Sequence, residues 1–124
     1  MLVYVATPYR AYSEEVFQKQ LNYTKKVSRE LALNKFTPIA PHLCFPSFLN
    51  DDIQEEREVG MECAKELLTT CKVVFSSTNI SEGMEAEIDL AEKLNIPVYF
   101  FKNIDELKSC MWKAKIDLGQ ENKK

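Results

Sequence analysis

The sequence predicts a single α/β domain, a Rossmann/flavodoxin-like three-layer sandwich with a mostly parallel sheet of four to five strands. Short β-branched and aromatic runs alternate with amphipathic stretches of ten or more residues, the pattern of βαβ units. The 124 residues are enough for one ordinary domain. A hydrophobic content of 45% and a charged content of 28% are typical of a globular protein with one core. We assign residues 1–118 to this domain and residues 119–124 to a polar C-terminal tail.

The first strand is expected at residues 2–6, where LVYVA is a short apolar run typical of a buried parallel strand. TPYR breaks this run. Ser13 is a plausible N-cap for a helix to about Leu33, because acidic residues follow it in the first turn. The remaining expected elements are a brief strand entering a proline-rich loop at 36–43, helices at 54–70, 81–95 and 104–116, and strands at 72–77 and 96–101.

Bulk properties exclude several classes of partner. A formal net charge of -3 argues against a protein that binds nucleic acid by neutralising phosphates. No apolar run is long enough to span a bilayer, and no signal peptide precedes the first strand. We therefore expect a cytoplasmic protein without a nucleic-acid or membrane partner.

Metal and cofactor motifs are absent from the sequence. None of the four cysteines is spaced as CxxC, and His42 is the only histidine. Neither GxGxxG nor GxxxxGK[ST] occurs. We expect no metal and no cofactor.

The predicted topology indicates where a ligand would bind. In open parallel sheets, ligands bind beyond the carboxyl ends of the strands, beside helix N-termini. Three segments should meet there: TPYR after the first strand, APHL after the second and STNISEG after the third.

Glu87 stands out within SEGMEAEIDLA, residues 81–91, because it shares the apolar stripe of Met84 and Ile88. A nucleophile or general base in a half-dry pocket would be placed in this way, and Gly83 would leave access from the loop open. A glutamate that snorkels off the edge of the stripe is the ordinary alternative. Pattern alone favours that alternative.

Other polar residues near the strand ends each have two interpretations. Ser81 could contact an anion or a ribose hydroxyl, or Ser81 or Asn79 could simply cap the helix. Arg10 could meet a phosphate or carboxylate, or be solvated in a turn. His42 fits a structural loop histidine better than a nucleophilic site. Arg57, in a charge-dense helix start, is either solvated or paired inward with an acid.

Taken together, these segments resemble the nucleoside 2-deoxyribosyltransferase superfamily, especially its short phage and bacterial members, which are related to deoxynucleoside 5'-monophosphate N-hydrolases. The resemblance runs from YVATPYR through PIAPHL, FLNDDIQEEREVGM and LLTTC to ISEGMEAEIDLAEKLNIPV. Its most specific pattern is a small or acidic residue, a glycine two on, a glutamate four later, then an apolar residue and an alanine. That pattern reads here as Ser81, Gly83, Glu87, Ile88 and Ala91.

The resemblance implies roles for named residues. Glu87 would be the nucleophile that attacks the anomeric carbon of the sugar, and Tyr4 would lie beside it. The loop after the first strand would hold the sugar and, in the hydrolases, its 5'-phosphate. The candidate substrate-binding residues are Thr7, Pro8, Tyr9, Arg10, His42, Ser81 and Gly83.

The resemblance also implies a homodimer or higher homo-oligomer in which a neighbouring subunit closes the pocket. Four apolar residues would suit such an interface, and would equally suit a core. They are Phe45, Phe48, Met61 and Trp112.

One departure from the family concerns an acid. The family usually has an aspartate in the helix before the third strand that helps to protonate the departing base. Here that position falls near Ala64, with Glu62 the closest acid, and a CD pair common in relatives reads Cys71-Lys72.

The leading hypothesis is an enzyme that cleaves or transfers the N-glycosidic bond of a (deoxy)nucleoside or nucleotide. The alternatives are a non-catalytic binder of a nucleotide-derived ligand in the same cleft and a structural assembly protein.

Overall fold

A computed structural model of the chain describes residues 1–11 and 13–122, with side chains as far as residue 119. Strands and helices alternate along it as the sequence predicts. The strands are β1 (Leu2–Ala6), β2 (Thr37–Ile39), β3 (Val73–Ser77) and β4 (Val98–Phe101). The α-helices are α1 (Glu14–Leu33), α2 (Gln54–Leu68), α3 (Glu82–Lys93) and α4 (Ile104–Asn122), and two 3-10 helices are η1 (Pro41–Leu43) and η2 (Phe45–Ser47).

The four strands form one parallel sheet in the order β2-β1-β3-β4. This confirms the predicted α/β class with a flavodoxin-like architecture. The neighbouring strands β1 and β3 lead into α1 and α3, and these two helices lie on opposite faces of the sheet. Such a switch point opens a crevice at the edge of the sheet.

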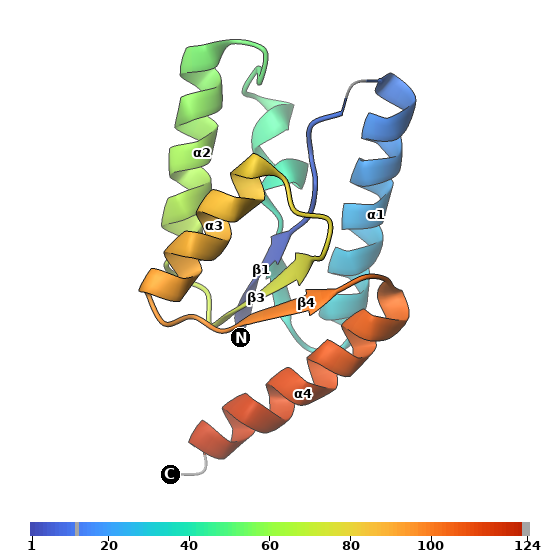
Figure 1. The fold of residues 1–124 in the computed structure, drawn as a ribbon, viewed down its shortest axis with the longest axis vertical. Coiled ribbons are helices and arrows are strands. Elements are labelled where there is room, and N and C mark those ends of the chain that lie inside the picture. The colour runs from blue at the N-terminus through green and yellow to red at the C-terminus, as the bar shows by residue number, and fades with distance from the viewer. Residues whose placement is uncertain (12, 123–124) are drawn as a thin grey trace.

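Helices cover both faces of the sheet, and the core is divided accordingly. Figure 1 shows α2 and α3 together on one side of the strands and α1 and α4 on the other. Successive strand residues point to opposite faces. Val3 and Val5 of β1 therefore pack toward α1 and α4, whereas Tyr4 and Ala6 pack toward α2 and α3. This alternation places the side chain of Tyr4 on the same face as α3.

Element ends follow local chemistry. The Ser13 hydroxyl accepts a hydrogen bond from the N–H of Val16 at 3.3 Å, which confirms the predicted N-cap of α1. The second strand stops at Ile39, because Pro41 begins a 3-10 helix, and the fourth strand begins only after Pro97.

The last helix is longer than the sequence suggests. Helix α4 extends to Asn122 rather than ending near residue 116, so the predicted polar tail is helical as far as the structure describes it. Residues 123 and 124 of that tail lie outside the described residues. Neither α4 nor any other described helix is both long and apolar enough to cross a membrane.

Candidate active site

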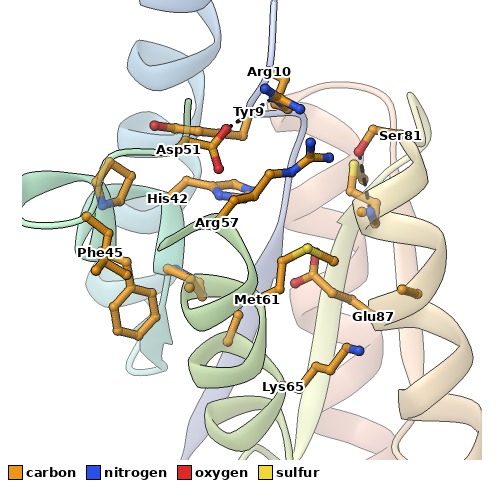
Figure 2. Close-up of a pocket in the computed structure, with 18 of the residues that line it drawn as sticks. Tyr9, Arg10, His42, Phe45, Asp51, Arg57, Met61, Lys65, Ser81 and Glu87 are labelled. Carbon is orange, nitrogen blue, oxygen red and sulfur yellow. Dashed lines mark hydrogen bonds and ion pairs between the residues drawn. The ribbon is translucent and has the colours of Figure 1, made fainter. Parts of the chain in front are cut away.

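A cleft of about 560 Å³ opens at the carboxyl ends of β1 and β3. The loop after β1, the η1–η2 segment, one side of α2 and the first turns of α3 line it (Figure 2). This volume falls within the range of small-molecule sites. The position matches the one that the predicted topology indicates for a ligand.

Glu87 lies on the wall of this cleft and is itself buried. The buried residues of α3 are Met84, Glu87, Ile88 and Ala91, so the carboxylate does share the apolar stripe. Only 9% of Glu87 is exposed, which excludes the snorkelling arrangement in this structure. Burial raises the pKa of Glu87 from 4.5 to about 7, with an opposing contribution from Tyr4. Near neutral pH the carboxylate is therefore partly ionised and poorly hydrated.

Tyr4 lies behind Glu87, on the central strand β1. Its side chain is completely buried, and its hydroxyl makes no hydrogen bond of standard geometry. The hydroxyl is nevertheless close enough to Glu87 that each group affects the pKa of the other. Burial and the facing carboxylate raise the pKa of Tyr4 well above 10.0, so the phenol keeps its proton. Tyr4 is thus a proton donor held next to a carboxylate.

Ser81 and Gly83 lie at the start of α3, on the rim of the cleft. The Ser81 hydroxyl accepts a hydrogen bond from the N–H of Met84 at 3.3 Å, which confirms the capping interpretation. Ser81 is also exposed to the cleft, so capping does not prevent contact with a ligand. A Cβ added at Gly83 would meet no atom within 4 Å, so this position is open space.

The loop after β1 contributes Tyr9 and Arg10. Tyr9 stacks on His42 with ring centroids 4.6 Å apart and an interplanar angle of 20°, forming a flat aromatic surface in the cleft. Burial lowers the pKa of His42 to about 4, so the imidazole is neutral at physiological pH. Arg10 forms an ion pair with Asp51 at 3.1 Å on the exposed rim.

The other two predicted residues of that loop lie elsewhere. Thr7 is completely buried, and its hydroxyl is hydrogen-bonded to that of Thr24 in α1 at 2.6 Å. Neither Thr7 nor Pro8 is among the residues that line the cleft.

Helix α2 forms the wall opposite Glu87. Arg57, Met61 and Lys65 follow one another at successive turns of α2 and face Ser81 and Glu87 across the cleft (Figure 2). Ala64 also lines this wall. Sequence reasoning left Arg57 undecided and did not consider Lys65. Arg57, Met61 and Lys65 recur at intervals of four residues, and this helical spacing is the signal that could have found the two cations.

Acids are missing from the middle of that wall. Glu62, the acid nearest to Ala64 in the sequence, is exposed and is not among the residues that line the cleft. Its carboxylate lies 3.8 Å from the Lys65 ammonium. In the described part of the chain, the Arg57 guanidinium forms no ion pair, so it is not paired inward with an acid. Among the described residues, no group of three or more His, Cys, Asp or Glu side chains could hold a metal ion.

Comparisons with known proteins add a family and a fold. A protein-family model described as "Domain of unknown function (DUF7768)" matches residues 1–101. No curated protein matches the sequence. Among the solved structures that match is a 2-deoxyribosyltransferase from the psychrotolerant bacterium Bacillus psychrosaccharolyticus, with a TM-score of 0.60 and 21% sequence identity over 82% of this chain and 72% of that chain. At this identity the likeness shows a shared fold.

Proposed function

The chain belongs to the DUF7768 family, and we propose that it is an enzyme that cleaves or transfers the N-glycosidic bond of a (deoxy)nucleoside or nucleotide. The observation that carries this proposal is the buried Glu87 carboxylate, which lies on the cleft wall with the Tyr4 hydroxyl behind it. The fold shared with a 2-deoxyribosyltransferase, a protein that by its name acts on deoxyribosyl groups, supports it further.

The proposed chemistry is a double displacement. An ionised Glu87 attacks the anomeric carbon, the base departs, and a glycosyl-Glu87 ester forms. Water or a second base then attacks the same carbon and releases Glu87, which separates hydrolysis from transfer. Burial suits this role because a poorly hydrated carboxylate is a better nucleophile. When the carboxylate leaves in the second displacement, little solvent has to rearrange around it. The Tyr4 hydroxyl would orient the carboxylate.

The rest of the cleft suits a nucleoside. The stacked Tyr9 and His42 rings give a planar ring or a sugar face a surface to pack against. Arg10 and the N-terminus of α3 would attract a 5'-phosphate if the substrate carries one. Gly83 keeps the approach to Glu87 open.

Release of free base from deoxynucleosides and their 5'-monophosphates, followed by chromatography, tests the proposal. The Glu87→Gln variant should lose at least about 1,000-fold in kcat, because it removes the nucleophile. Glu85→Gln, an exposed neighbour on the same helix, is the matched control and should keep full activity. Undiminished turnover by Glu87→Gln would rule out this mechanism.

A second candidate is a non-catalytic binder of a nucleotide-derived ligand. It is favoured by Ala64, which lines the cleft where the resemblance implies an acid. Thermal-shift measurements with nucleosides, nucleoside monophosphates and ADP-ribose-like ligands separate the two candidates. Stabilisation by a ligand that is never cleaved would support the binder.

We also propose that the protein is a homodimer or a larger homo-oligomer. Phe48 and Trp112 are exposed by 65% and 70%. However, Phe45 and Met61 line the cleft, whereas Trp112 lies on α4 at the other face of the sheet, so the four apolar residues do not form a single patch. Light scattering of the purified protein measures its mass in solution.

A further inference from the structure

The wall of the cleft that faces Glu87 carries positive charge. Arg57 and Lys65 lie one turn on either side of Met61, and all three side chains line the cleft (Figure 2). Arg57 forms no ion pair with a described residue, and Lys65 has only the partly exposed contact with Glu62 at 3.8 Å. Exposed pairs of that kind contribute little free energy, so both cations are available to a ligand.

Glu62, His42, Asp51 and Glu56 are each in the wrong place or the wrong state to protonate a departing base. Glu62 is not among the residues that line the cleft. His42 is neutral at physiological pH because burial lowers its pKa to about 4. Asp51 pairs with Arg10, and Glu56 accepts a hydrogen bond from the backbone N–H of Asn50 at 3.0 Å. Glu82 also lines the cleft, but it belongs to the same helix as Glu87. A base that leaves opposite Glu87, toward α2, therefore meets the cations of that helix.

We propose that this wall receives the leaving base as an anion, so that the enzyme acts on nucleosides whose base is an acidic, oxo-rich ring. The inference rests on the proposed function and names its substrate class. Arg57 supplies a planar fork of N–H donors that matches ring carbonyls, and Lys65 adds a second positive charge. The thioether of Met61 packs against the ring between them.

The step balances without an acid. A Glu87 oxygen forms a bond to the anomeric carbon as the carbon–nitrogen bond breaks, and the bonding electron pair stays on the base. The base departs as an anion whose charge is spread over its ring carbonyls and held by Arg57 and Lys65. When water attacks the glycosyl-Glu87 ester, its oxygen joins the sugar. One of its protons passes to the base anion or to solvent, and Glu87 is released as a carboxylate.

A matched pair of purine substrates tests this inference. Deoxyxanthosine carries an oxo-rich, acidic base, whereas deoxyadenosine has a similar shape and a base that must be protonated to leave. We expect the unmodified protein to have a kcat/KM for deoxyxanthosine at least about tenfold above that for deoxyadenosine. Arg57→Met and Lys65→Met should each lower kcat/KM for deoxyxanthosine by about 10- to 100-fold, the loss expected for a hydrogen bond to a charged group. Both methionine variants should change kcat/KM for deoxyadenosine by less than about threefold. Arg57→Lys should keep part of the kcat/KM for deoxyxanthosine that Arg57→Met loses.

Controls separate this inference from a structural effect. Lys26→Met, at an exposed position of α1, should leave both substrates unaffected. Equal losses on both substrates in Arg57→Met would overturn the inference, as would a preference of the unmodified protein for deoxyadenosine.

Binding of free urate, an oxo-rich purine anion, by calorimetry gives a readout that does not depend on turnover. We expect Glu87→Gln to bind urate and Arg57→Met to bind it at least about tenfold more weakly. If no nucleoside is cleaved but this pattern holds, the proposed function fails while the anion-binding wall stands. If urate does not bind, or binds equally to Arg57→Met, the wall is not an anion site.

Discussion

Glu87 on α3 lies on the wall of the cleft with Tyr4 of β1 behind it, and each lacks a strong partner of its own. The Tyr4 hydroxyl makes no hydrogen bond of standard geometry, and Glu87 forms no ion pair with a described residue. A buried phenol and a buried carboxyl are costly to leave unpaired. Their juxtaposition therefore indicates a pair that tightens when Glu87 ionises.

Tyr4→Phe should shift the pH dependence of catalysis upward. The Tyr4 hydroxyl lowers the pKa of Glu87, so without it the value should rise above about 7. The acidic limb of kcat/KM should move to higher pH in the same direction. Urea unfolding should show a stability change of less than about 1 kcal/mol, because the lost hydroxyl makes no hydrogen bond of standard geometry.

Tyr23→Phe is the matched control for that variant. The Tyr23 hydroxyl is also buried without a hydrogen-bond partner, but it belongs to α1 on the other face of the sheet. It should leave the pH profile in place. An unshifted acidic limb in Tyr4→Phe would show that the phenol does not act on Glu87.

Glu87→Gln should stabilise the protein at alkaline pH. Burial raises the pKa of Glu87 from 4.5 to about 7, so the folded state binds its proton more tightly than the unfolded state does. As pH rises from about 4.5 to about 7, the unfolded carboxyl ionises first, and the free energy of unfolding falls by about 3 kcal/mol in total. A glutamine side chain does not ionise, so the stability of Glu87→Gln should not fall over this pH range. Its free energy of unfolding, measured by chemical denaturation at each pH, should equal that of the unmodified protein below pH 4.5 and exceed it above pH 7.

Glu85→Gln, at an exposed position of the same helix, serves as the reference for that comparison. It should show no such pH-dependent gain. Equal stability of Glu87→Gln and the unmodified protein at pH 8 would mean that the carboxylate is better solvated than its burial indicates.

Gly83→Ala should stabilise the fold and impair binding. No atom lies within 4 Å of the added Cβ, and the residue is inside α3, so alanine should raise the free energy of unfolding by up to about 1 kcal/mol. The same methyl group would project into the approach to Glu87 and should raise KM several-fold. Gly119→Ala in α4, where the Cβ also meets nothing within 4 Å, should stabilise without changing KM. Identical kinetics for both variants would show that access past Gly83 does not limit binding.

Asp51→Asn should favour phosphorylated substrates. Arg10 is paired with Asp51 at 3.1 Å, and an incoming phosphate must compete with that carboxylate. Removing the carboxylate should lower KM for deoxynucleoside monophosphates several-fold, leave KM for deoxynucleosides unchanged, and alter stability by less than about 1 kcal/mol because the pair is exposed. Arg10→Met should instead raise KM for the deoxynucleoside monophosphates. If both substrate classes respond alike, Arg10 does not contact the phosphate.

The sequence predicted the fold and the position of Glu87 because both depend on short-range periodicity. Strand and helix alternation defined the sheet, and a spacing of three to four residues put Glu87 on the buried stripe of α3. Other features depend on contacts between distant segments. The Thr7 hydroxyl pairs with Thr24 in α1, a contact that local pattern does not show. The direction of Arg57 into the cleft depends on how α2 packs beside α3, and α4 continues past its expected end near residue 116 into the polar segment.

The proposed double displacement requires Glu87 to become covalently attached to the sugar. Incubation with a slow fluorinated deoxynucleoside analogue, followed by proteolysis and mass spectrometry, tests it directly. We predict an adduct with the mass of the fluorinated sugar on the peptide that contains Glu87, and none in Glu87→Gln. Base release accompanied by an adduct on a residue other than Glu87 would contradict this mechanism. Base release by Glu87→Gln at an undiminished rate would contradict it as well.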